Sequence, residues 1–285
     1  MTQNLMSEEK KSEELLITAC RKGNIEEARN LLQNPLINPN CLSQDQFVAT
    51  PFYFACKNGH IEVMKLLLNE DRVDINKPSI HGVTPFYSTC YNGHVDVVTL
   101  LLNDKRVDVN KAQDEGETPF GIACKNGKFE VVKLLLNDKR VDMNKADTKG
   151  WTPFYLACLN GNIEVVKLLL NDERADLNKP SKYYNQTPFY ITCDNGHIEG
   201  QLEIVKYILA SEREVNVNAK DEEGKTAIDI ARERRKEDKG KWESEEDFKK
   251  RTQRLDNIIE LLGSFEKNSK ETRAKLRKEL GLSGN

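Results

Sequence analysis

The residues of this sequence most able to do chemistry are its seven cysteines. Six of them occur at nearly even spacing, each directly after Ala or Thr: Cys20, Cys56, Cys90, Cys124, Cys158 and Cys193. Thiols in such a series could form disulfides or bind zinc, but stacked helices lie about 8 to 10 Å apart. That distance exceeds the roughly 7 Å limit between the Cα atoms of a disulfide and is too long for a zinc cage. We therefore expect a ladder of small core residues with free thiols, which agrees with a reducing compartment. Cys41 lies outside this series.

Four histidines could also act as ligands or as acid-base groups. Three of them follow a glycine, namely His60, His94 and His197. Because side chains that recur in one context are usually required for packing, we interpret these three as structural. His81 stands apart at an expected turn tip, where a partner could reach it.

The sequence lacks the motifs of common enzymes. It has no His-Glu-x-x-His, no phosphate-binding loop, no nucleophile elbow and no pair of carboxylates with catalytic spacing. We therefore predict a protein that is not an enzyme and has no cofactor and no metal site.

The charge of the 285-residue chain offers little attraction to nucleic acid or to anionic membranes, because the formal net charge is -3. No apolar run has the length of a membrane span, and the first residues lack the apolar core of a signal peptide. We expect a monomeric protein in the cytoplasm, with the nucleus as the alternative.

The elements that position these residues repeat with a period of about 34 residues. The string Thr-Pro-Phe begins at Thr50, Thr84, Thr118, Thr152 and Thr187, and a degenerate copy begins at Thr226. Each of the five full copies continues through Ala/Thr-Cys-x-Asn-Gly to an apolar stretch. A fixed period of this length is typical of stacked repeat architectures.

One period, residues 50 to 83, predicts two short helices and a turn. Thr50 suits an N-cap and Pro51 the first helical position, while Gly59 can end the helix in the left-handed conformation. A second helix is expected from Ile61 to Leu68. Its apolar residues point to several sides, so neighbouring repeats must cover it. The polar remainder indicates an extended connection with a tight turn at its tip.

These motifs resemble the ankyrin repeat, whose signature is a period near 33 with the pattern T-P-L-H-x-A. Residues Thr50 to Ala55 align with that pattern, with Phe for Leu and Tyr for His, and Gly59 to Val63 resemble the start of the family's second helix. Two features depart from the family. Gly121 stands where other copies have Tyr, and a longer connection of the Asn-Asp-Lys-Arg type replaces the glycine after helix two. The Phe-Tyr version resembles the expanded ankyrin families of single-celled eukaryotes.

The resemblance implies an all-α ankyrin solenoid of about seven helix-turn-helix repeats, with beta-turn tips and a C-terminal capping helix. It also implies that the histidines after glycine connect the loops of neighbouring repeats. We expect a flexible N-terminal arm at 1–11, an ankyrin domain at 12–264 and a C-terminal helix within 265–285. The repeats are expected at 12–41 (an N-terminal cap), 42–77, 78–111, 112–145, 146–179, 180–218 and 219–264 (a degenerate C-terminal cap).

Three features interrupt the pattern near the C-terminus. Extra residues around 199–201 lengthen either the loop between two helices or the second helix. A charged insertion at 232–254 splits the last repeat, and we expect Trp242 and Phe248 to hold it against the fold. Ser269 is the predicted N-cap of the final helix, which ends near Gly281 and docks on the last repeat.

Positions that vary between repeats are free to specify a partner, and in ankyrin folds they line a concave surface. Exposed aromatic residues there favour protein binding, since Trp and Tyr dominate binding hot spots. Local packing on a neighbouring loop is the alternative for each of them. We predict that the protein is a scaffold or adaptor that binds another protein through turn-tip residues Phe47, Ile80, His81, Trp151, Tyr183 and Tyr184 and through helix-end residues Lys57, Tyr91, Lys125, Leu159 and Asp194. Of these, Trp151, Tyr91, Leu159 and Tyr183 are expected at the centre, while Lys57, Lys125 and Asp194 select charge.

Nucleic-acid binding is the alternative function. It would use Arg232, Arg234, Arg235 and Lys236 together with the basic segment 270–278. The acidic residues interleaved with the insertion weaken this alternative, because they turn it into a solvated segment of mixed charge.

Overall fold

The structure is a computed structural model that describes residues 2–195 and 200–282. Within these ranges the chain forms fifteen α-helices and one short 3-10 helix, η1 (Ile80–Gly82), and it has no strand. The fold is an all-α repeat solenoid, as predicted. It divides into two compact units, one made of residues 1–123 and 130–142 and the other of residues 124–129 and 143–285. His197 lies outside the described residues.

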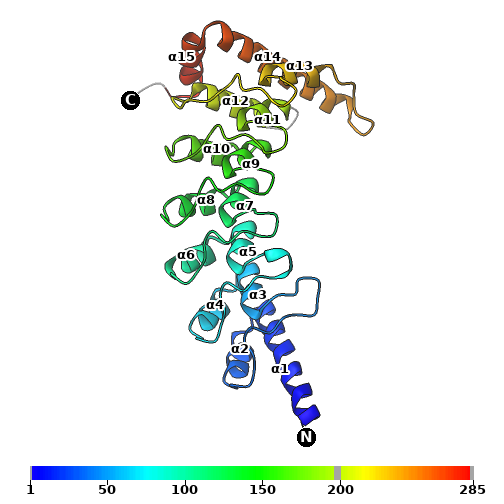
Figure 1. Ribbon diagram of the computed structural model, residues 1–285, viewed down its shortest axis with the longest axis vertical. Coiled ribbons are helices and arrows are strands. Elements are labelled where there is room, and N and C mark those ends of the chain that lie inside the picture. The colour runs from blue at the N-terminus through cyan, green and yellow to red at the C-terminus, as the bar shows by residue number, and fades with distance from the viewer. Residues whose placement is uncertain (1, 196–199, 283–285) are drawn as a thin grey trace. The chain divides into compact units, whose positions relative to one another are not determined.

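The first unit contains successive pairs of antiparallel helices, which Figure 1 shows in blue to green. Its helices are α1 (Thr2–Lys22), α2 (Ile25–Leu32), α3 (Pro51–Lys57), α4 (Ile61–Leu68), α5 (Pro85–Asn92), α6 (Val95–Asn103) and nearly all of α8 (Phe129–Leu136). The first helices of successive pairs pack against one another, α1 on α3 and α3 on α5. Helix α7 (Pro119–Lys125) contributes residues to both units.

The second unit continues the same pattern and ends in longer helices. It contains α9 (Pro153–Leu159), α10 (Ile163–Leu170), α11 (Pro188–Asp194), α12 (Gln201–Ala210), α13 (Ala227–Lys236), α14 (Glu245–Lys267) and α15 (Ser269–Glu279). Helix α11 packs between α9 and α13, and α15 packs on α12 and α14.

The Thr-Pro strings begin helices in the predicted way. The hydroxyl of Thr50 accepts a hydrogen bond from the Tyr53 amide at 3.1 Å, and Thr84 accepts one from the Tyr87 amide at 3.0 Å. Thr226 forms a capping box with Asp229. Each threonine thereby satisfies one of the free amides at a helix start, which stabilises the helix by about 1 kcal/mol.

The cysteine ladder is confirmed as core, since all seven cysteines are buried and outside any disulfide in the described structure. Burial raises the pKa of Cys20, Cys41 and Cys158 to about 12. The thiolate is the reactive form of cysteine, so these side chains are inert at neutral pH.

Asparagine side chains link the segment that follows one helix pair to the corresponding segment of the next repeat. The Asn76 amide nitrogen donates to the Arg106 carbonyl at 2.7 Å, and its oxygen accepts from the Asp108 amide at 2.9 Å. The same pair of bonds is made by Asn40, Asn110, Asn144 and Asn178 with the backbone 30 to 38 residues further along the chain. One side chain therefore satisfies two backbone groups of the following repeat, which explains why the closing Asp-x-Asn is constant.

The departure from the family's glycine after helix two also has a structural role. Arg106 donates to the Leu68 carbonyl at 2.9 Å, at the C-terminal end of α4, while Asp104 holds its guanidinium. Arg140 makes the same contact with the Leu102 carbonyl in α6 at 2.7 Å. Each arginine thus caps free carbonyls of the preceding repeat, as a cation at a helix C-terminus does.

The predicted contacts of the histidines with the neighbouring repeat are confirmed where the structure describes them. His60 Nε2 lies 2.9 Å from the Arg21 carbonyl, and His94 Nε2 lies 2.9 Å from the Lys57 carbonyl. Gln201 takes this place at the start of α12, where its side-chain amide donates to the Cys158 carbonyl at 2.8 Å. Helix α12 begins at Gln201 with Gly200 as its N-cap, while residue 199 of the predicted extra segment lies outside the described residues.

Three details of the sequence interpretation were wrong. Residues 2–11 are not a flexible arm but the first part of α1, because they hold good helix formers without Gly or Pro. The N-cap of α15 is Asn268, whose side chain accepts from the Glu271 amide at 3.2 Å, and not Ser269. Trp242 does not hold the insertion against the fold, since 91% of it is exposed. The insertion instead consists of extensions of α13 and α14 around a short loop.

Candidate interaction surface

The turn tips share one backbone feature. The residue two positions before each threonine N-cap has a positive φ, and these residues are Val48, Gly82, Gly116, Gly150, Asn185 and Gly224. Glycine adopts this conformation without steric cost, and Asn tolerates it better than other residues do. Valine is unfavourable there because it is β-branched.

In the first unit, the side chain of the tip residue Phe47 is covered by local packing. Its ring contacts Phe54 edge to face at 6.1 Å between centroids, beside the buried cluster that includes Tyr53 and Ala49. The Lys57 ammonium lies 3.4 Å from the Phe47 ring centroid. Burial lowers the pKa of Lys57. Two of the predicted contact residues therefore contact each other.

Three other predicted residues of the first unit are exposed. Ile80 and Tyr91 expose 44% and 50% of their surfaces, and His81 is exposed in the left-handed conformation of η1. Backbone bonds hold this tip, since the Ile80 amide donates to the Phe47 carbonyl and the Asp114 amide to the His81 carbonyl, both at 3.0 Å. These side chains are available to a partner.

In the second unit, aromatic residues of two successive tips line a recess of about 280 Å³. Its lining residues are Lys149, Trp151, Ser181, Tyr183 and Tyr184. The Trp151 ring stacks on Tyr155, with centroids 5.6 Å apart and planes 10° from parallel. Tyr183 and Tyr184 remain 55% and 62% exposed.

Lysines flank this aromatic recess, and backbone bonds fix its two tips together. The Lys149 ammonium lies 4.6 Å from the Trp151 ring centroid, and that of Lys182 lies 5.6 Å from Tyr183. The Lys182 amide donates to the Lys149 carbonyl at 2.8 Å. The recess is therefore preorganised, apolar and positively charged at its edge.

Family comparison agrees with this architecture. A family model described as ankyrin repeats (3 copies) matches residues 15–113 and 106–181, and a single ankyrin repeat matches residues 184–222. The chain belongs to the ankyrin-repeat family. Ankyrin repeats are generally protein–protein interaction modules. A search of curated proteins found no match to the chain.

The remaining predicted contact residues of this ankyrin protein are less accessible. Lys125 and Leu159 are half-buried. Asp194 is buried, and one carboxylate oxygen lies 2.5 Å from Arg234 Nε. Its expected role in selecting a charged partner is therefore replaced by an internal ion pair, which attaches α13 to the end of α11. The distance of 40 residues between the two partners hid this pair from sequence analysis.

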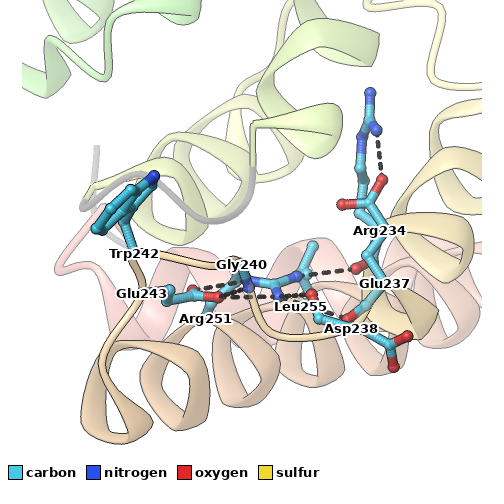
Figure 2. A pocket seen from close by; sticks show the side chains of 8 residues that line it. All are labelled: Arg234, Glu237, Asp238, Gly240, Trp242, Glu243, Arg251 and Leu255. Carbon is cyan, nitrogen blue, oxygen red and sulfur yellow. Dashed lines mark hydrogen bonds and ion pairs between the residues drawn. The ribbon is translucent and has the colours of Figure 1, made fainter.

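The arginines of the alternative nucleic-acid surface have partners within the ankyrin chain. Arg235 pairs with Asp256 at 2.6 Å, and Arg234 pairs with Asp194 and, as Figure 2 shows, with Glu237. In the basic segment, Arg273 and Arg277 donate to carbonyls at the end of α12. Cations that already have partners offer little gain from phosphate contacts.

No metal site or membrane span was found in the part of the ankyrin chain that the structure describes. The residues 2–195 and 200–282 contain no cluster of three or more His, Cys, Asp or Glu side chains suited to a metal ion. None of the helices in these ranges combines the length and the apolar character needed to cross a membrane.

Proposed function

We propose that this protein is a non-catalytic scaffold or adaptor that binds a partner protein through the aromatic recess of its second unit. The observation that carries the proposal is the exposure of Tyr183 and Tyr184 beside Trp151 on a tip that backbone bonds hold in place. Tyrosine and tryptophan bury large areas with few rotatable bonds, so an ordered aromatic recess is a favourable centre for an interface.

The exposed residues of the first unit provide a separate proposed contact surface within that unit. Ile80, His81 and Tyr91 lie on ordered backbone, whereas Phe47 and Lys57 are occupied by each other. We therefore assign partner contacts to the first three residues and a stabilising role to the other two.

The ion pairs of Arg234 and Arg235 with internal carboxylates support a protein partner over a nucleic acid. Random duplex DNA is the appropriate counter-probe. We expect no salt-dependent binding to it at physiological ionic strength.

Affinity capture from the native cell tests the proposal. Full-length wild type is immobilised beside the double variant Tyr183→Ser, Tyr184→Ser and a control, Leu36→Ser, which removes an exposed apolar side chain away from the tips. We expect a specific set of proteins on wild type and control, reduced at least about tenfold on the double variant, because hot-spot residues cost more than about 1 kcal/mol each. All three proteins should melt within about 2 °C of one another, since surface substitutions have small effects. Equal capture by the double variant would contradict the proposal.

A further inference from the structure

Copies of the dipeptide Asn-Gly stand at the end of the first helix in successive repeats. Four of them lie within the described residues and begin at Asn58, Asn92, Asn126 and Asn160. Asparagine is a chemically labile residue. Before glycine it is open to attack by the next backbone nitrogen, because glycine has no side chain that hinders the approach. These repeats therefore hold four candidates for one intramolecular reaction.

The reaction converts the side-chain amide into a ring and then into a carboxylate. The glycine nitrogen attacks Cγ of the asparagine and forms an N–Cγ bond, while the Cγ–Nδ2 bond breaks and the amino group leaves as ammonia with the proton of the glycine amide. Water then opens the resulting succinimide at either carbonyl and yields aspartate or isoaspartate. The asparagine side chain must rotate before the attack, so a hydrogen bond that holds its amide slows the reaction about fivefold.

Three of the four asparagine side chains are held by such a bond. Nδ2 of Asn58 donates to the Arg21 carbonyl of the preceding repeat at 2.9 Å. Nδ2 of Asn92 and of Asn160 each donates to the carbonyl four residues earlier in the chain, at 2.8 Å and 2.9 Å. In these copies the bonded amide keeps the carbon that would be attacked in a fixed position.

Asn126 is the exception. Its side chain is exposed and has no hydrogen bond to any residue of 2–195 and 200–282. Exposure alone does not distinguish it, since Asn58 and Asn160 are exposed as well. The glycine amides do not distinguish it either, because all four donate to backbone carbonyls at 3.0 to 3.3 Å. The missing side-chain bond is therefore the difference between Asn126 and the other three.

We propose that Asn126 is a site of spontaneous deamidation in the folded protein, and that it reacts ahead of Asn58, Asn92 and Asn160. The product carries a carboxylate directly after Lys125, the last residue of α7, where the helix dipole is unfavourable to negative charge. Isoaspartate also lengthens the backbone by one carbon atom before α8. Aged molecules thus differ from new ones in charge and backbone at this joint, independently of any partner.

Peptide mapping of the full-length protein tests the proposal. The folded protein is kept at pH 8 and 25 °C in water enriched in oxygen-18, so that each succinimide takes up one labelled oxygen as it opens. Cleavage after glutamate places Asn126 in the segment 118–130, apart from the other three asparagines. We expect Asn126 to convert at least about fivefold faster than each of them, because it has no side-chain hydrogen bond to break.

The denatured protein is the matched control. In guanidinium chloride the hydrogen bonds of the fold are lost, and every pair has glycine as its second residue, so the four asparagines should convert at similar rates. In the folded variant Asn126→Gln the early product should disappear, because glutamine would have to form a larger ring. Conversion at the other three asparagines should stay as in wild type, and circular dichroism confirms that the variant is folded.

The proposal is overturned if Asn126 in the folded protein converts no faster than Asn58 or Asn160. It is also overturned if the lead of Asn126 persists in guanidinium chloride, since the flanking sequence and not the structure would then be its cause. An absence of any product in the folded protein, over a period in which the denatured protein converts fully, would contradict it as well.

Discussion

The Val48 tip and the Asn185 tip occupy the same place in their repeats, and both lack the glycine of the other tips, yet they treat their aromatic residues in opposite ways. At the Val48 tip, Phe47 turns inward onto Phe54 and is covered by Lys57. At the Asn185 tip, Tyr183 and Tyr184 stay exposed, and the side-chain amide of Asn185 donates to the Lys220 carbonyl at 2.9 Å. An aromatic residue at a tip is therefore evidence for binding only when nothing in its own repeat covers it.

The largest effect that tests this comparison is expected from Phe47→Ala. Because the ring contributes to a packed cluster and supports Lys57, the variant should lose about 2 to 3 kcal/mol of unfolding free energy in urea, somewhat less than a fully buried Phe. Partner capture by the folded protein should be unchanged. The matched variant Tyr184→Ala should alter stability by less than about 0.5 kcal/mol. Equal stability losses in the two variants would refute the distinction between the tip with a packed Phe47 and the tip with an exposed Tyr184.

Exchanging the residue types of Val48 and Asn185, the two tip positions with positive φ that lack glycine, should change the free energy of unfolding in opposite directions by about 1 to 2 kcal/mol. Val48→Asn relieves a β-branched residue at a φ of 43°, so we expect a gain of about 1 kcal/mol. Asn185→Val introduces that strain and removes the bond to Lys220, so it should lose about 2 kcal/mol. Chemical unfolding of both variants provides the measurement, and a destabilised Val48→Asn would show that valine is required there for packing.

Acid should loosen the Val48 tip before the Asn185 tip, with a smaller effect. Burial tends to raise the pKa of Asp45, but hydrogen bonds from Ser43 and the Phe47 amide and the neighbouring Arg21 outweigh it and hold the pKa below its ordinary value of 3.8. The stabilisation is therefore complete above that value and is lost as the pH falls through the lower pKa of the folded state. The corresponding support at the other tip is the hydroxyl of Ser181, which accepts from the Gln186 amide and does not titrate.

Amide hydrogen exchange along the chain measures this difference. Between pH 5 and pH 3, protection of the Phe47 and Ala49 amides should fall relative to that of the Gln186 amide, after correction for the intrinsic pH dependence of exchange. Asp45→Asn should remove the difference between the two pH values. A parallel loss of protection at both tips would contradict the assignment.

Local signals in the sequence predicted the fold well. Thr50 and its counterparts cap helices, and the cysteines are core residues, because each depends on neighbours within its own or the next repeat. The interaction surface was harder to predict, since Phe47 packs on Phe54 whereas Tyr183 and Tyr184 are exposed, and an aromatic residue at a tip does not by itself show which of these applies. The Asp194–Arg234 pair and the exposure of Trp242 depend on the path of a non-repeating insertion, for which the period gives no template.

The asparagine bonds have a mechanical consequence. Among the described residues of each unit, each of these asparagine side chains links the segment after one helix pair to the corresponding segment of the next repeat only. A unit pulled from its ends would therefore lengthen one repeat at a time, each step releasing one asparagine amide and the helix pair beside it, and a relaxed chain would re-form its repeats in the same increments.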